Sequence, residues 1–236
     1  MGADVRHWLA GAVVVLFVAG CGGLAIDTGP VPPAPGSPTR VDVERLLAGV
    51  RVVPNRPHPG GYERGCKAGQ GCVFGPAWTD DNDAPGGHDG CDTRNNVLAA
   101  QLTEVRLRQG TNDCVVIGGI LTDPYTGKRI PFEKAEADKV QIDHVYPLAA
   151  AWDMGAAFWP IDRRIRFAND LDTNLLATDG RTNQAKGDKT PAEWLPPARA
   201  NHCFYAGKYL TAAIHYDLAL TVADNMALQA VARNCP

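Results

Sequence analysis

Residues 140–147 read Val-Gln-Ile-Asp-His-Val-Tyr-Pro, residues 174–177 read Asn-Leu-Leu-Ala, and residues 183–187 read Asn-Gln-Ala-Lys-Gly. The first stretch predicts a short strand that stops at Pro147, because proline cannot donate to a strand ladder. Asp143 and His144 lie at the end of that strand. Asn183 follows Asn174 by nine residues. Several polar side chains are thus expected around one strand end, which makes this region the candidate functional site.

These residue types match what phosphodiester hydrolysis requires. A group must remove a proton from the attacking water, and positive charge must stabilise the departing oxygen. His144 suits the first task, because the ordinary histidine pKa near 6.5 leaves much of it neutral at physiological pH. The Asp143 carboxylate and the Asn183 amide offer the oxygen ligands that hard divalent cations prefer. Neighbouring strand residues face opposite sides, so a local turn before Pro147 is needed to bring both to one phosphate.

The pattern of the three segments resembles the HNH endonuclease family, the ββα-metal finger of the His-Me finger superfamily, in its variant with asparagine at the third place. The chain is also similar to an exported bacterial branch of that family, related to the C-terminal nuclease domain of modification-dependent restriction enzymes. The segments that carry this second likeness are Gly90–Asn95, Asp123–Gly127 and Phe167–Asp170. The resemblance covers about residues 62–235 and implies a finger at about residues 140–190.

The resemblance also implies a role for each site residue. His144 would be the general base, and Asp143 and Asn183 would be metal ligands. Asn174 would hold the loop between the strands so that His144 is aimed correctly. Asparagine at the third place implies oxygen-ligated Mg²⁺ or Mn²⁺ rather than zinc. The implied substrate is nucleic acid, DNA before RNA, and the implied phosphate contacts are Lys186, Arg166 and Arg94.

Two other classes of function stay open. A nuclease-like fold without turnover would only bind nucleic acid or a partner protein, although every catalytic position carries a competent residue type. A structural surface lipoprotein would leave the pattern from Asp143 to Lys186 unexplained. The formal net charge of −3 argues against tight, non-specific coating of DNA. It does not exclude a nuclease, since a cleft with a bound cation supplies positive charge locally. No obligate protein partner is indicated.

The N-terminus has the pattern of an export signal over residues 1–20. Residues 8–20 are apolar and follow Arg6 and His7. As a helix they would rise about 20 Å, short of the roughly 30 Å bilayer core, which favours a cleaved signal over a spanning helix. The last residues, Val18-Ala19-Gly20-Cys21, resemble a bacterial lipobox, which implies lipidation of Cys21 and a membrane anchor. Plain secretion is the alternative. Proline-rich residues 21–40 predict a tether, and residues 41–236 the nuclease domain.

The cysteines beyond Cys21 predict disulfides. Six remain, an even number, and an exported protein enters an oxidising compartment. A zinc site is the competing interpretation, but the spacing offers no two-residue cysteine pair. Connectivity is open among fifteen schemes, of which neighbour pairing is the simplest. The residues are Cys66, Cys72, Cys91, Cys114, Cys203 and Cys235.

Hydrophobic spacing elsewhere predicts an α+β fold, with a small antiparallel element embedded among helices. Apolar residues at helical spacing predict a helix over residues 94–109. Pro124 and Gly127 predict a turn between two strands. Proline and glycine make residues 54–90 mostly loop. Further helices are expected over residues 41–50, 149–158, 204–220 and 224–233.

Overall fold

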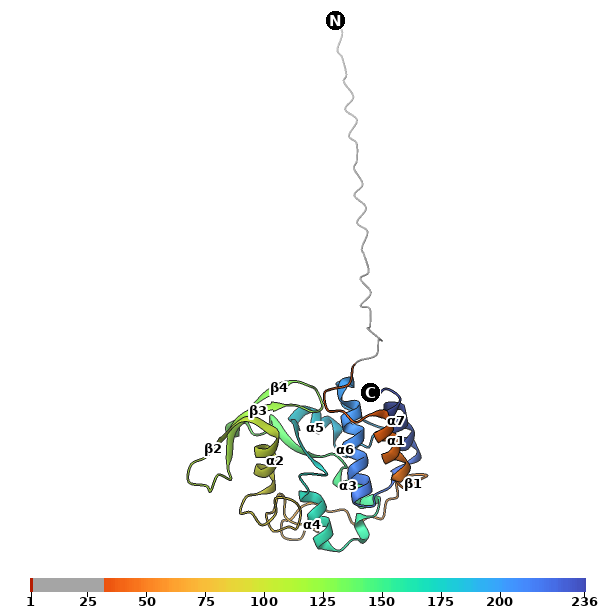
Figure 1. The fold of residues 1–236 in the computed structure, drawn as a ribbon. Helices are drawn as coiled ribbons and strands as arrows, with labels where there is room; N and C mark the ends of the chain where they lie inside the picture. Colours follow the sequence, from red (N-terminus) through yellow and green to blue (C-terminus); the bar gives the residue numbers. More distant parts are fainter. Residues whose placement is uncertain (2–31) are drawn as a thin grey trace. The chain divides into compact units, whose positions relative to one another are not determined.

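The computed structural model describes Met1 and residues 32–236, so the predicted export signal and Cys21 lie outside the described residues. Among the described residues, none of the helices combines the length and apolarity needed to cross a bilayer. Residues 32–236 form a mixture of helices and small sheets (Figure 1). The predicted α+β fold class is therefore confirmed.

Three helices pack together and form one side of the main core. They are α1 (Arg40–Gly49), α6 (His202–His215) and α7 (Val222–Ala232), which lie side by side in Figure 1. A capping box at Thr39 begins α1, and another at Thr221 begins α7. The short strands β1 (Val52–Val53) and β7 (Leu220–Thr221) pair in parallel, which joins the segment after α1 to the segment before α7. These contacts hold the chain termini of the folded part on the same core.

Part of the predicted tether lies on this helical layer. The Ala34 amide donates to the Ala200 carbonyl at 2.8 Å, and the Arg40 amide donates to the Pro236 carbonyl at 2.8 Å. The Pro38 ring lies close to Gly207 on α6, where a Cβ would come within 2.9 Å of it. Glycine at position 207 thus permits the approach, and the folded domain begins before residue 41.

The helix expected over residues 94–109 is wrong in its second half. Helix α2 (Thr93–Gln101) is capped by Asp92 and ends at Gln101, and the chain continues as strand β2 (Leu102–Leu107). The side chain of Gln101 accepts from the Ala177 amide and donates to the Leu175 carbonyl. The pairing of this segment with β3 thus outweighs the helical spacing of its apolar residues. Strands β2, β3 (Val116–Thr122) and β4 (Arg129–Glu133) form an antiparallel sheet, and the predicted turn joins β3 to β4.

The segment around the candidate site is a hairpin with a short helix. Strands β5 (Val140–His144) and β6 (Leu175–Asp179) are antiparallel, and α5 (Gly180–Lys186) follows directly. Between the strands run α3 (Leu148–Asp153) and α4 (Ile161–Asn169). The hairpin lies between two hydrophobic cores. Ile142 and Leu175 belong to the smaller core, which includes residues of α2 and the three-stranded sheet, and Leu176 belongs to the main core. Its backbone is therefore held from both faces.

Two predicted helices are shorter than expected, each for a backbone reason. The helix over residues 149–158 is interrupted at Gly155, where φ is 139°, and only a 3₁₀ turn (Ala156–Phe158) follows. Helix α6 ends at His215, and Asp217 adopts a left-handed φ of 54°. Helix α4, which begins after Pro160, had no counterpart among the predicted helices.

Three disulfides hold the loop-rich parts of the domain. They join neighbouring cysteines, the simplest of the open schemes, and no cysteine of residues 32–236 is left over. Cys66–Cys72 closes a loop before the site. Cys91–Cys114 joins the segment before α2 to the segment before β3. Cys203–Cys235 joins α6 to the segment after α7.

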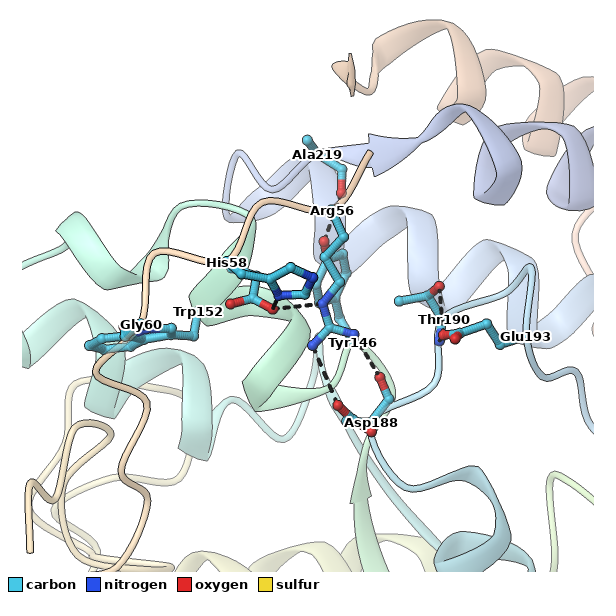
Figure 2. A network of polar contacts seen from close by, with 10 residues as sticks. Arg56, His58, Gly60, Tyr146, Trp152, Asp188, Thr190, Glu193 and Ala219 are labelled. Carbon is cyan, nitrogen blue, oxygen red and sulfur yellow. Dashed lines mark hydrogen bonds and ion pairs between the residues drawn. The ribbon is translucent and has the colours of Figure 1, made fainter. Parts of the chain in front are cut away.

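The loop after β1 is fastened to the domain by polar contacts, shown in Figure 2. Arg56 forms an ion pair with Asp153 at 2.8 Å and another with Asp188 at 3.4 Å. The Trp152 indole N–H donates to the Gly60 carbonyl at 2.7 Å. Since Asp188 lies just beyond α5, these contacts hold residues 56–60 beside the hairpin and helix of the candidate site.

Candidate functional site

The turn that follows His144 is fixed by Asn174. The Tyr146 amide donates to Asn174 Oδ1 at 2.8 Å, and Asn174 Nδ2 donates to the Tyr146 carbonyl at 3.2 Å. The backbone of Asn174 also accepts from the Val145 amide at 2.8 Å. Asn174 is fully buried. It thus continues the pairing of β5 and β6 by one residue, up to Pro147, the residue before α3.

Asp143 is a buried carboxylate with two side-chain partners. Lys186 Nζ donates to Asp143 Oδ1 at 2.9 Å, and the Tyr125 hydroxyl donates to Asp143 Oδ2. Lys186 also donates to the His144 carbonyl at 2.8 Å. Burial raises the pKa of Asp143 and lowers that of Lys186, while their mutual attraction opposes both shifts. The site therefore contains an ion pair held in a region of low water content.

Tyr125 reaches Asp143 from the turn between β3 and β4. That turn is organised by Asp123, whose carboxylate accepts from the Tyr125 and Thr126 amides and from the Thr178 hydroxyl on β6. Both Asp123 and Tyr125 are fully buried. The Asp-Pro-Tyr-Thr-Gly segment thus serves to join the three-stranded sheet to the hairpin.

His144 is held in one orientation and one tautomer. Its Nε2 lies 2.9 Å from the Ala168 carbonyl, which can only accept, so Nε2 carries the proton and Nδ1 is an acceptor. Burial, with the nearby charge of Arg64, lowers the pKa of His144 to about 3. The imidazole is therefore neutral at physiological pH, as a proton acceptor must be.

An aromatic side chain covers one face of His144. The Trp78 ring stacks on the imidazole with centroids 5.5 Å apart and an interplanar angle of 10°. Trp78 has φ of 59°, which is uncommon for a bulky residue. The long loop before α2 thus holds a strained backbone at this point and contributes a wall of the site.

The structure brings Asp143, His144 and Asn183 to one cavity of about 420 Å³. Asn183, half-buried on α5, donates from Nδ2 to Gln141 Oε1 at 3.0 Å, so its Oδ1 is left as an acceptor. Tyr62 and Arg64, which follow residues 56–60 in the same loop, also line this cavity. Sequence reasoning missed these two residues as well as Trp78, because isolated side chains in a loop carry no spacing signal. Tyr125 belongs to the Asp123–Gly127 segment, but the sequence does not predict its contact with Asp143.

None of the three predicted phosphate contacts lines this cavity. Lys186 is fully buried on Asp143 and is not available to a phosphate. The guanidinium of Arg94 donates to the Ala137 and Val140 carbonyls behind β5. Arg166 on α4 lines a separate cavity with Asp162 and Tyr216. Two of these side chains thus support the fold around the site, and Arg64 is the cation that faces it.

Comparisons with known proteins agree with the motifs. Residues 92–231 match the family model described as GmrSD restriction endonucleases, C-terminal domain. An uncharacterized secreted protein of Arthroderma benhamiae is 34% identical over 207 residues, which cover 87% of this chain and 91% of that protein. No solved structure matches. The chain belongs to the family of GmrSD restriction endonuclease C-terminal domains, an HNH-like nuclease family.

Proposed function

We propose that this protein is a metal-dependent endonuclease that hydrolyses phosphodiester bonds of DNA, with RNA as the alternative substrate, outside the cytoplasm. Its reactive unit would be a ββα finger formed by β5, β6 and α5. The observation that carries the proposal is that Asp143, His144 and Asn183 line one cavity. Membership of an HNH-like nuclease family supports it.

His144 is assigned the role of general base. Its Nδ1 is the free acceptor of a neutral ring, and the Ala168 carbonyl fixes the ring through Nε2. A water held at Nδ1 would transfer its proton there as it attacks phosphorus. Asn174 is assigned to positioning, because its bonds to Tyr146 fix the backbone that directly follows His144.

The oxygen atoms around the cavity fit a hard divalent cation. A carboxylate has about four lone-pair sites, and the two hydrogen bonds to Asp143 leave capacity for a ligand bond. Asn183 Oδ1, a neutral amide oxygen, is a second oxygen donor on the same cavity. Mg²⁺ or Mn²⁺ bound by these residues would act as a Lewis acid on the phosphate and the departing oxygen.

The direct test is incubation of the pure protein with supercoiled plasmid. Nicked and linear products are expected with Mg²⁺ or Mn²⁺, and none with EDTA. Ribosomal RNA and single-stranded DNA in parallel reactions rank the substrates. An absence of cleavage with every cation would reject the proposed activity, and leave only nucleic-acid or partner binding.

Asn183→Ala is expected to raise the Mg²⁺ or Mn²⁺ concentration needed for half-maximal cleavage, because it removes one oxygen ligand. Part of the rate should return at high metal concentration. Cleavage rate against metal concentration measures this, with Asn183→Asp, which keeps an oxygen donor, as the matched control. An unchanged metal curve in Asn183→Ala would remove Asn183 from the ligand set.

Export is supported by the three disulfides and by the relative named as secreted. We further propose that Cys21 is lipidated and anchors the protein to a membrane. Cys21→Ala is then expected to release the protein from the membrane fraction or to block its processing. Fractionation followed by immunoblotting measures both. Membrane-bound Cys21→Ala protein of mature size would contradict the anchor.

A further inference from the structure

A second, mostly apolar cavity of about 360 Å³ adjoins the polar one. Its wall includes Phe74, Pro76, Ala77 and Trp78 from the long loop, together with Ala168 from α4. The disulfide-closed loop contributes Cys66. Its volume falls within the range of roughly 300–1,000 Å³ found for small-ligand sites. Of this wall, only His144 and the Ala168 carbonyl that fixes its ring have roles in the proposed hydrolysis, and the loop residues have none.

The two cavities meet at His144 and Arg64, which line both. Arg64 is exposed, and within residues 32–236 its side chain makes no hydrogen bond or ion pair. The two carboxylates that line the polar cavity with it are paired with other residues, Asp143 with Lys186 and Asp188 with Arg56. An uncommitted guanidinium between a polar and an apolar cavity suits a ligand with a charged end and a flat apolar end.

A nucleotide has that composition. Its phosphate would be held by Arg64 at the side of His144, and its base would lie next to Trp78 and Phe74, since aromatic and guanidinium groups are the surfaces on which unpaired bases stack. We propose that the apolar cavity holds the base of a nucleotide adjoining the scissile phosphate, and that the protein therefore prefers single-stranded or unpaired nucleic acid. A base inside a duplex is paired and stacked, and cannot enter such a cavity without being extruded. This inference rests on the proposed nuclease function.

Binding in EDTA tests the cavity without turnover. The full chain is titrated into three fluorescein-labelled DNA probes: a single-stranded 12-mer, the same 12-mer with abasic residues throughout, and a 12-base-pair duplex. The abasic strand keeps the phosphates but lacks the bases. The intact strand is expected to bind about 5–150-fold more tightly than the abasic strand, the effect of stacking one base. The duplex should bind no better than the abasic strand.

A cavity-filling variant locates the effect. Ala77→Leu adds three carbons to the wall at an exposed loop position, so it should lower affinity for the intact strand to that of the abasic strand and leave abasic binding unchanged. Ala135→Leu, at an exposed position outside the cavity, is the matched control and should bind like the wild type. Arg64→Ala should weaken the intact and abasic strands alike.

The outcomes separate this inference from the proposed activity. Equal wild-type affinity for intact and abasic strands would overturn the base cavity, and so would an Ala77→Leu protein that keeps the preference. Either result is compatible with cleavage of plasmid. A preference for the intact strand that Ala77→Leu abolishes supports the cavity, even if no cation yields cleavage and the nuclease activity is rejected.

Discussion

Replacing His144 with alanine is expected to lower the rate of phosphodiester cleavage by about 10²–10⁴-fold or more. The substitution removes the Nδ1 acceptor but leaves Asp143 and Asn183 on the same cavity. Metal binding should therefore survive while turnover is lost. The measurement is cleavage rate at saturating Mn²⁺, beside calorimetric titration with Mn²⁺ and circular dichroism of both proteins.

His215→Ala is the matched control, because His215 is exposed at the end of α6. It should cleave at the wild-type rate. The Asn174→Ala protein is expected to cleave at a rate between those of these two variants at every metal concentration. A displacement of about 1 Å in the general base lowers the rate on the order of 10²-fold. Wild-type activity in a folded His144→Ala protein would reject the base assignment.

Lys186→Met is expected to destabilise the metal-free domain by about 3–5 kcal/mol, because it leaves the buried Asp143 carboxylate without its cationic partner. Lys186 has no exposed surface, and Asp143 retains only the hydroxyl of Tyr125. In a domain of this size the loss corresponds to a fall in Tm of about 6–20 °C. Urea and thermal unfolding in EDTA measure it.

The double variant Asp143→Leu with Lys186→Met removes both charges and should be more stable than Lys186→Met alone. Added Mn²⁺ should raise the Tm of Lys186→Met more than that of the wild type, because a cation at Asp143 would replace the missing charge. A Lys186→Met protein as stable as the wild type in EDTA would show that the ion pair contributes nothing to folding.

Strand β5 could be predicted from a local signal, whereas its partner β6 and helix α5 were implied only by the family resemblance, which placed a finger at about residues 140–190. The local signal for β5 is Pro147, which stops the strand, and in the structure the apolar run after Asn174 pairs with it. The even number of cysteines beyond Cys21 likewise predicted disulfides. Family resemblance supplied the proposed roles of the polar residues, which local patterns alone leave ambiguous.

The parts that could not be predicted depend on packing between distant segments. Trp78 lies 66 positions before His144 in a loop without periodicity, and Arg64 lies earlier still. Lys186 carries the same charge whether its end reaches solvent or Asp143, so its burial follows only from the fold. Strand β2 replaced a predicted helix because its partner β3 supplies backbone hydrogen bonds that helical spacing does not reveal.

The three covalent bridges also determine where the molecule can exist in its working form. In a reducing compartment they stay open, and each missing bridge removes about 2–5 kcal/mol from a total stability of about 5–15 kcal/mol. Under the proposed nuclease activity, a chain retained in the cytoplasm would remain largely unfolded and so could not cleave the chromosome. If the proposed export and activity hold, oxidative folding after export would protect the producing cell, because its reducing interior keeps the bridges open.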